Sequence, residues 1–232
     1  MISWKIIPPT FGRIYATMES YRIPAREIRN EIKVVNSRFI ATLAPVFEVN
    51  EAKVFIARIK AEYSDASHNV PAFVVWYGAT IVAHCNDDGE PSGTAGRPAL
   101  AVLQGSWLGD AAVVVTRYFG GTKLGKCGLV RAYGDAVRQV LKIAPQAEKV
   151  LTQTLIFALP YAYFERARLL IEGHHGEIMD EEFAADITMT CRFKIDDSPH
   201  FEKALTELSH GVIKAIILED KEVTIMPIRK TK

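Results

Sequence analysis

The sequence predicts an α+β protein of two domains, and three observations carry that prediction. Ten of the 15 glycines lie within Gly89–Gly134, and glycine becomes rare after Pro145. Residues 1–149 carry 18 Lys and Arg against 13 Asp and Glu, a net charge of +5, whereas residues 150–232 carry 10 against 14, a net charge of −4. The C-terminal part alternates as strand, helix, strand, strand, helix, strand, the order of a ferredoxin-like βαββαβ sandwich. The boundary is expected near Pro145 to Val150. The predicted domains are residues 1–147 and 148–232.

The composition excludes several classes of protein. Hydrophobic residues make up 49% and charged residues 24%, so the chain can bury a core and is not disordered. The net charge of +1 excludes a histone-like basic protein and an acidic tail protein. No apolar run approaches the roughly 20 residues that span a bilayer, and the N-terminal MISWKIIPPTFGR is a poor signal peptide. Cys85, Cys127 and Cys191 resemble neither a disulfide framework nor a zinc site, so we expect a soluble cytoplasmic protein.

The elements of the first domain follow from the spacing of its apolar residues. Strand-like runs at residues 28–35 and 39–46 flank Asn36-Ser37, which suits a hairpin turn. Asn50 is expected to cap a helix whose apolar positions follow the helical period. Ala112–Tyr118 is continuously apolar for most of its length, as in a central strand buried on both faces. The other expected elements are strands at residues 70–77 and 81–85, a helix from Pro98, and a helix over residues 128–144.

The second domain shows a clearer alternation. Apolar side chains occupy the odd positions from Ile187 to Ile195 and polar ones most of the even positions, the pattern of a half-buried strand. The run from Glu222 to Ile228 is expected to extend the last strand or its sheet. The expected elements are strands at residues 151–159, 177–182, 187–195 and 212–218, and helices at residues 163–174 and 199–209.

The first of two glycine-rich loops is NDDGEPSGTAGRP, residues 86–98, between an expected strand and helix. Ordering such a glycine-rich loop costs conformational entropy, and this cost favours a functional role for the loop. Its end, SGTAGR, approaches a helix N-terminus, where unsatisfied backbone N–H groups favour anions. The carboxylates of Asp87, Asp88 and Glu90 are candidates for binding a metal or pairing with arginines; capping of turns is an equally weighted alternative.

The second glycine-rich loop is TRYFGGTKLGKCG, residues 116–128, which also joins a buried strand to a helix. Its cations stand beside two aromatic residues, a plausible footprint for phosphate or RNA. The alternative is that Arg117 pairs with Asp87 or Asp88 and the aromatic rings belong to the core. Neither loop matches a Walker motif or the dinucleotide fingerprint. A Cys127 nucleophile with His68 as its base is a weaker hypothesis, because a lone cysteine is a weak signal.

The two loops together resemble the signature of the YigZ/IMPACT family. That resemblance rests on DDGEPSGTAGRP (residues 87–98) followed by VVVTRYFGGTKLGKCGLVRAYGDA (residues 113–136), with NSRFIA and DASH upstream. It covers about residues 20–145; the C-terminal half resembles the second domain of the bacterial members in pattern and position. One departure is Cys127-Gly128, where the family commonly has Gly-Gly, so a side chain narrows the loop at this point.

The resemblance implies a fold and a functional setting. It implies an N-terminal domain similar to the second domain of a small-subunit ribosomal protein and to domain IV of elongation factor G. The C-terminal domain is then similar to the ferredoxin-like domains of the same factor. Eukaryotic IMPACT proteins restrain the general-control kinase by competing for its ribosome-bound activator, and for bacterial members the usual suggestion is binding of nucleic acid or the ribosome.

Two functional hypotheses remain. The first is a non-catalytic factor of translation or stress regulation that binds RNA, the ribosome or a translation-associated protein. The second is an enzyme that acts on a phosphorylated small molecule, with Mg²⁺ held by the acidic loop. Under the first hypothesis no catalytic residue, cofactor or metal ligand is assigned. The residues expected to bind an anionic ligand are Asp87, Asp88, Glu90, Ser92, Thr94, Arg97, Arg117, Tyr118, Gly120, Gly121, Lys123, Lys126 and Arg131.

Both loops follow strands and lead into helices, so we expect them to emerge at one end of the N-terminal sheet. Asp88 or Glu90 is then expected within hydrogen-bonding reach of Arg117, Lys123 or Arg131.

Overall fold

The computed structural model describes residues 5–6, 20–77 and 80–228, and most of the MISWKIIPPTFGR segment lies outside them. The chain divides into two compact units, Met1–Glu148 and Lys149–Lys232. None of the helices in the described part of the chain is long and apolar enough to cross a membrane.

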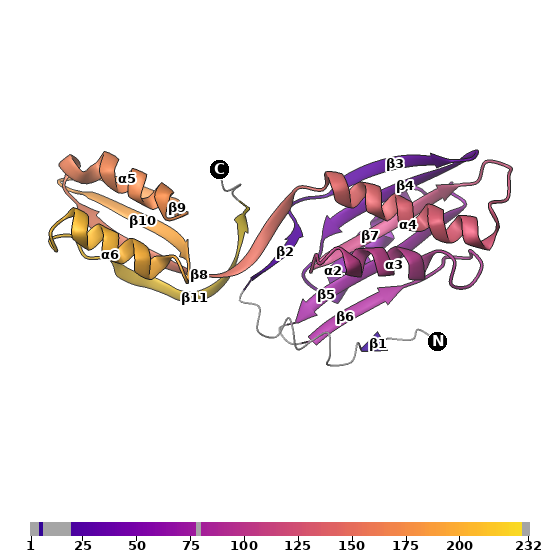
Figure 1. Cartoon of the computed structure of the whole chain (residues 1–232), viewed down its shortest axis with the longest axis horizontal. Helices are drawn as coiled ribbons and strands as arrows, with labels where there is room; N and C mark the ends of the chain where they lie inside the picture. The colour runs from indigo at the N-terminus through magenta and orange to yellow at the C-terminus, as the bar shows by residue number, and fades with distance from the viewer. Residues whose placement is uncertain (1–4, 7–19, 78–79, 229–232) are drawn as a thin grey trace. The chain divides into compact units, whose positions relative to one another are not determined.

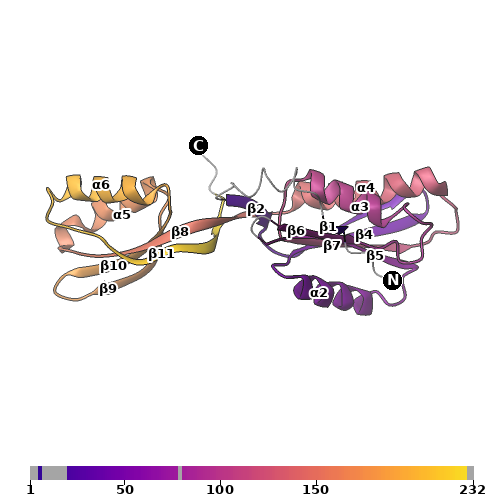
Figure 2. The ribbon, with the colours of Figure 1, turned by 90° about the horizontal axis from the view of Figure 1, so that it is seen from below.

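The N-terminal unit is built on an antiparallel sheet in the order β1-β6-β5-β7-β4-β3. Helices α3 and α4 cover one face of this sheet and α2 covers the other (Figures 1 and 2). The strands are β1 (Lys5–Ile6), β3 (Ile28–Val34), β4 (Ser37–Pro45), β5 (His68–Tyr77), β6 (Thr80–Cys85) and β7 (Ala111–Tyr118). The helices are α2 (Val49–Glu62), α3 (Gly96–Gly105) and α4 (Gly125–Ile143). A further strand, β2 (Ser20–Pro24), pairs with β8 (Gln146–Leu159).

Strand β7 is the central strand that its apolar run predicts. Its first seven residues are buried, because alternate side chains enter two different cores. Val113 and Val115 pack with residues of α3 and α4, whereas Ala112 and Val114 pack with residues of α2. Burial of both faces explains why the strand is apolar without alternation.

The direction of the strands brings the two glycine-rich loops to one edge. Strands β6 and β7 both pair antiparallel with β5, so they run in the same direction on either side of it. Their C-terminal ends therefore lie at the same end of the sheet, beside the start of β5 at His68. The prediction that both loops emerge at one end is confirmed.

Several local predictions for this unit are wrong in detail. The hairpin turn is Val35-Asn36, because Val34 pairs with Ser37. Asn50 lies inside α2, which is capped at Glu48, and the Glu51 carboxylate accepts the Phe47 backbone N–H at 2.7 Å. Helices α3 and α4 begin at Gly96 and Gly125, two and three residues before the expected starts. Lys126 and Cys127 are therefore in the first turn of α4 and not in a loop.

The C-terminal unit has the predicted ferredoxin-like fold. Its strands lie in the order β11-β8-β10-β9, with two helices on one face of the sheet (Figure 2), and its apolar residues form one core. The order β8-α5-β9-β10-α6-β11 is the predicted βαββαβ. The elements besides β8 are α5 (Phe164–Gly173), β9 (Glu177–Phe183), β10 (Ile187–Lys194), α6 (Ser198–Leu208) and β11 (Ile216–Pro227), with a 3₁₀ turn at Tyr161–Tyr163 before α5.

Two boundaries in this part of the chain differ from expectation. Strand β8 begins at Gln146, so the chain passes from one compact unit to the other inside a strand. The last strand begins at Ile216 instead of Val212, because His210 and Gly211 adopt positive φ angles of 51° and 82° and prolong the turn after α6. The run after Glu222 extends that strand to Pro227, as one of the two alternatives predicted.

Candidate functional site

The carboxylate of Asp87 occupies the N-terminus of α3. It accepts backbone N–H groups from Gly93 at 2.8 Å, Ala95 at 3.1 Å and Gly96 at 2.8 Å. Burial opposes ionisation of Asp87, but these three donors and the nearby Arg97 outweigh it and lower the pKa of the carboxyl. The expectation that the amides of this loop are open to a ligand is therefore wrong, because the chain supplies its own anion there.

Asp87→Asn is expected to lower the free energy of unfolding of the N-terminal unit by about 1–2 kcal/mol at neutral pH. Asn keeps the shape but presents one acceptor oxygen and no charge to three N–H donors. Since the pKa of Asp87 is lowered on folding, its contribution is present above the unfolded pKa of about 3.9 and is lost as pH falls through the folded value. Urea titrations at about pH 7 and about pH 3 measure this, and a difference between wild type and variant that does not shrink in acid contradicts it.

The other two carboxylates of the first loop also point to protein donors. Asp88 accepts the backbone N–H of Asn69 at 2.6 Å and forms an ion pair with Lys60. Glu90 is buried, at 7% exposure, and its Oε1 accepts hydrogen bonds from Arg117 at 2.6 Å and from the Tyr133 hydroxyl at 2.8 Å. A shared Mg²⁺ site on the three acidic residues would have to compete with all of these partners.

Glu90 and Arg117 form a buried ion pair that joins the two loops. The prediction that Glu90 lies within reach of Arg117 is confirmed, and the two side chains are only 3% and 6% exposed. Burial and the charge of Glu90 raise the pKa of Tyr133 far above its ordinary value, so its hydroxyl remains a donor. His68 completes the cluster, with Nδ1 2.7 Å from the Asp88 carbonyl oxygen and Nε2 3.9 Å from Glu90. Cys127 is not among these partners of His68 in the described part of the chain, so the structure gives no support to a Cys127–His68 nucleophile and base.

The second loop is held against the β3–β4 hairpin by a close backbone contact. A Cβ atom added to Gly120 would lie 1.9 Å from the Asn36 carbonyl oxygen, so only glycine fits. Its N–H donates to the Ser37 hydroxyl at 3.3 Å and is therefore not open to a ligand. Tyr118 was expected with the cations, but alternation places it on the opposite sheet face, where its hydroxyl donates to Asp65 at 2.8 Å.

Gly120→Ala is expected to lower the free energy of unfolding by about 3 kcal/mol, because the new methyl group meets backbone that cannot move aside cheaply. Gly121→Ala is the matched control, since no atom lies within 4 Å of its Cβ position and only its φ of +82° is unfavourable. That strain costs about 1–2 kcal/mol. Urea unfolding of both variants measures the difference, and equal costs would show that the contact with Asn36 is not tight.

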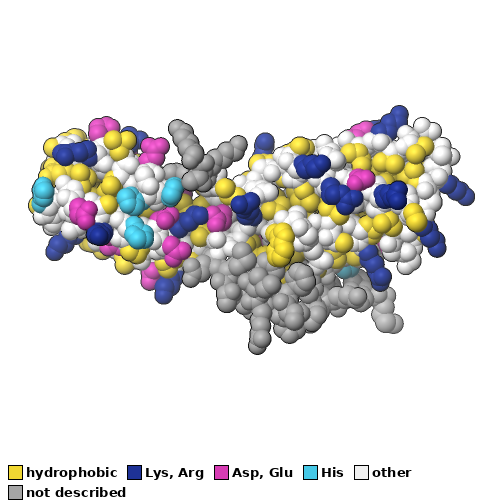
Figure 3. Space-filling view, viewed as in Figure 1, with side chains coloured by type: hydrophobic (Ala, Val, Ile, Leu, Met, Phe, Trp, Pro, Cys, Tyr) yellow, Lys and Arg dark blue, Asp and Glu magenta, His cyan; other side chains and the backbone are white. Residues whose placement is uncertain are grey.

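The exposed cations gather on the layer formed by α3 and α4, which we call the basic face. Figure 3 shows Lys and Arg outnumbering Asp and Glu over these helices. Six exposed cations define it: Arg97, Lys123, Lys126, Arg131, Arg138 and Lys142. Asp135 is the acidic residue among the exposed positions of α4, and it pairs with Arg138 at 2.7 Å. In the described part of the chain, the other five cations take part in no salt bridge.

Helix α2, on the opposite face, is charged differently. There Arg58 pairs with Glu27, Lys60 with Asp88, and Glu62 with Arg29 on β3. Cations on this side are largely neutralised by neighbours within the chain, whereas those of the basic face are available to an external anion.

The structure thus separates the predicted site residues into groups. Lys123, Lys126 and Arg131 lie on the basic face with Arg97, and Ser92 and Gly121 are exposed nearby in the chain. Thr94 is buried, with its hydroxyl donating to the Pro91 carbonyl at 2.6 Å. Arg117 was expected to face a ligand and is instead buried, because alternation along β7 turns it toward the core beneath α4. The residues whose polar groups bond to other groups of the protein are Asp87, Asp88, Glu90, Thr94, Arg117 and Gly120.

Four residues belong to the basic face or to the cluster around Glu90 although the sequence did not indicate it. Arg138 and Lys142 extend the basic face along α4; their polar helix face was the available signal, but it also suits plain solvation. Tyr133 and His68 belong to the Glu90 cluster. Tyr133 falls on the apolar face of its helix, so nothing in the periodicity indicates a hydrogen-bonding role.

Comparison with known proteins identifies the family. Residues 35–141 match the model of the Impact N-terminal domain, and residues 157–212 match a domain of unknown function, DUF1949. The chain is 36% identical to an IMPACT family member of Haemophilus influenzae over 203 residues, which cover 87% of this chain and 98% of the relative. The chain belongs to the IMPACT family.

Other IMPACT family proteins differ in how much of the chain they match. IMPACT family member YigZ of Escherichia coli is 34% identical over 88% of this chain and 100% of its own length. Protein IMPACT of Bos taurus is 33% identical over 38% of this chain and 29% of its own length. A crystal structure described as that of a hypothetical protein has a TM-score of 0.56 at 33% identity, covering 88% of this chain and 100% of the other.

Proposed function

We propose that this IMPACT family protein is a non-catalytic cytoplasmic regulator of translation or of a stress response, and that it binds RNA, free or within the ribosome, through the basic face. The observation that carries the proposal is the contrast between the two sides of the N-terminal sheet. The exposed cations on α3, α4 and the loop before α4 that form no salt bridge with a described residue gain most from phosphate, since no ion pair has to break when they bind.

The placement of acidic and aromatic side chains elsewhere in the N-terminal unit also supports RNA binding at the basic face. The carboxylates of Asp87 and Glu90 are turned into the protein, so they do not repel a polyanion approaching the basic face. Exposed Phe119, with the Arg117 guanidinium 5.4 Å from its ring centroid, lies in the second glycine-rich loop and offers a stacking surface to an unpaired base.

The hypothesis of an enzyme for phosphorylated substrates receives less support. It needs Asp87, Asp88 and Glu90 as metal ligands and the loop amides as a phosphate cradle. Protein groups already bind these three carboxylates and the amides of Gly93, Ala95, Gly96 and Gly120. A Cys127 nucleophile receives less support again, because its proposed base, His68, contacts the Asp88 carbonyl and Glu90.

The proposal is tested with the full chain, purified ribosomes and, separately, single-stranded RNA of about 20 nucleotides. Co-sedimentation with ribosomes and filter binding of the RNA, each at about 50 mM and about 500 mM salt, are expected to show association at the lower concentration and release at the higher, as counterion release requires. A chain that binds neither partner at the lower salt concentration contradicts the proposal and leaves a translation-associated protein as the better partner.

A further inference from the structure

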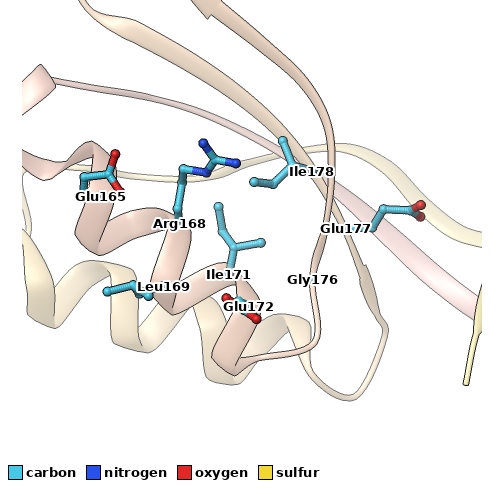
Figure 4. Close-up of a pocket in the computed structure, with 8 residues that line it drawn as sticks. All are labelled: Glu165, Arg168, Leu169, Ile171, Glu172, Gly176, Glu177 and Ile178. Carbon is cyan, nitrogen blue, oxygen red and sulfur yellow. The ribbon is translucent and has the colours of Figure 1, made fainter. Parts of the chain in front are cut away.

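The C-terminal unit has a groove of about 520 Å³ between helix α5 and strand β9. The helix contributes the stripe Glu165, Arg168, Leu169 and Glu172, which are spaced i, i+3, i+4 and i+7 and so share one side of α5. Figure 4 shows Ile171 of the helix and Ile178 of the strand between the two elements. The groove therefore has an apolar floor and charged side chains along its helical wall.

Part of the apolar lining of the groove is exposed to water. Leu169, on the helical wall, is 68% exposed, and Ile178 of β9 is half-buried. Ile171 of the same lining is fully buried. An aliphatic side chain of a partner placed between Leu169 and Ile178 would remove apolar surface from water on both sides of the groove.

The charge around the groove is negative. Glu165, Glu172 and Glu177 line it, and none of the three forms a salt bridge with another described residue. The one cation of the lining is Arg168. Its Nε lies 3.7 Å from the Glu181 carboxylate of β9, so its positive charge is largely offset. Residues 150–232 carry a net charge of −4. Such a groove attracts Lys and Arg and repels RNA.

Strand β9 also offers backbone groups to a partner. It stands at the end of the strand order and pairs with β10 on one side only within the described sheet. Its first residues, Glu177 and Ile178, form the strand side of the groove. An extended segment can therefore add to the edge of β9 while its side chains reach the groove.

We propose that this groove binds an extended, basic segment of a partner protein. An aliphatic side chain of the segment packs against Leu169 and Ile178. The Lys or Arg residues two positions before and after it, which share its face in an extended chain, lie opposite Glu165 and Glu172. This site lies in the C-terminal unit and does not depend on the basic face.

The test uses the full chain and a fluorescein-labelled peptide of about ten residues in which Lys and Leu take turns at every second position, with Ser between them, so that both share one face of the extended peptide. A peptide with Ser in place of Leu has the same charge. Fluorescence anisotropy gives the dissociation constants. The Glu165→Gln/Glu172→Gln double variant is expected to weaken binding of the Leu–Lys peptide about fivefold. Leu169→Asn is expected to weaken it about tenfold. Replacing Leu by Ser in the peptide has an effect at least as large as that of Leu169→Asn.

The matched control removes two negative charges from the other helix of the same unit. Glu202→Gln/Glu207→Gln on α6 is expected to leave the affinity within about twofold of wild type, because both residues lie outside the groove. Equal weakening by the α5 and α6 variants would show attraction to the net charge alone. Unchanged affinity in Leu169→Asn would show that nothing is seated in the groove, and either result overturns the proposal. Far-ultraviolet circular dichroism checks that the variants are folded.

Discussion

Glu90→Ala is expected to lower the free energy of unfolding of the N-terminal unit by about 3–5 kcal/mol, because it leaves a buried charge without its partner. The Arg117 side chain is 6% exposed, and within the described residues its Nε already has no hydrogen-bond acceptor. Without Glu90, the side-chain hydrogen bond left to Arg117 among the described residues is the 3.4 Å one to the Ser37 hydroxyl. The Tyr133 hydroxyl loses its acceptor in the same variant.

Tryptophan fluorescence during a urea titration measures this loss of stability in the N-terminal unit alone. All three tryptophans, Trp4, Trp76 and Trp107, belong to Met1–Glu148, so the signal does not include unfolding of the second unit. The control is Glu31→Ala, which breaks the exposed pair of Glu31 with Arg38 and is expected to cost less than about 1 kcal/mol. Similar costs for the two variants would mean that the Glu90–Arg117 pair is hydrated and does not hold the loops together.

The Lys123→Ala/Lys126→Ala/Arg131→Ala triple variant is expected to bind single-stranded RNA about 10- to 100-fold more weakly than wild type at about 100 mM salt. The three side chains are exposed and form no salt bridge with a described residue, so their removal costs contacts with phosphate and little stability. The loss is expected for every RNA sequence alike, since phosphate contacts carry no sequence information.

A second triple variant, Arg58→Ala/Lys203→Ala/Lys214→Ala, removes the same number of positive charges elsewhere. Arg58 lies on α2, Lys203 on α6, and Lys214 between α6 and β11. Affinity within about threefold of wild type is expected for this variant. If both triple variants weaken binding equally, the RNA is attracted by net charge and the basic face is not its site. Filter binding at one salt concentration is sufficient for this comparison.

Much of the architecture follows from local sequence patterns. The continuous apolar run of β7 indicated burial on both faces, and the odd-numbered apolar residues of β10 indicated a half-buried strand. The strand–helix order fixed the ferredoxin-like topology of the second unit, because right-handed, short connections leave few alternatives. The meeting of Glu90 and Arg117 followed from two loops that leave equivalent strands at one edge.

The site was harder to predict because a charged side chain has several candidate partners in the sequence and only the tertiary structure selects one. Asp87 resembled a ligand-binding carboxylate and is the anion that caps α3. Arg117 and Lys123 are both cations of the second glycine-rich loop in the sequence, but Arg117 belongs to β7 and its side chain is buried. The sequence also did not reveal that β8 crosses the domain boundary. A drop in glycine content indicates a change of architecture but does not show where a strand begins.

The central claim is that the basic face binds RNA through unpaired cations, and the salt dependence of binding tests it most directly. The association constant of the full chain for single-stranded RNA is measured over a series of salt concentrations, for wild type and for the Lys123/Lys126/Arg131 triple variant. At about 0.7 units per phosphate contact, the slope of log K against log salt is expected to become shallower by about 2 in the variant. A slope that is the same in both proteins, or near zero in wild type, would contradict the claim.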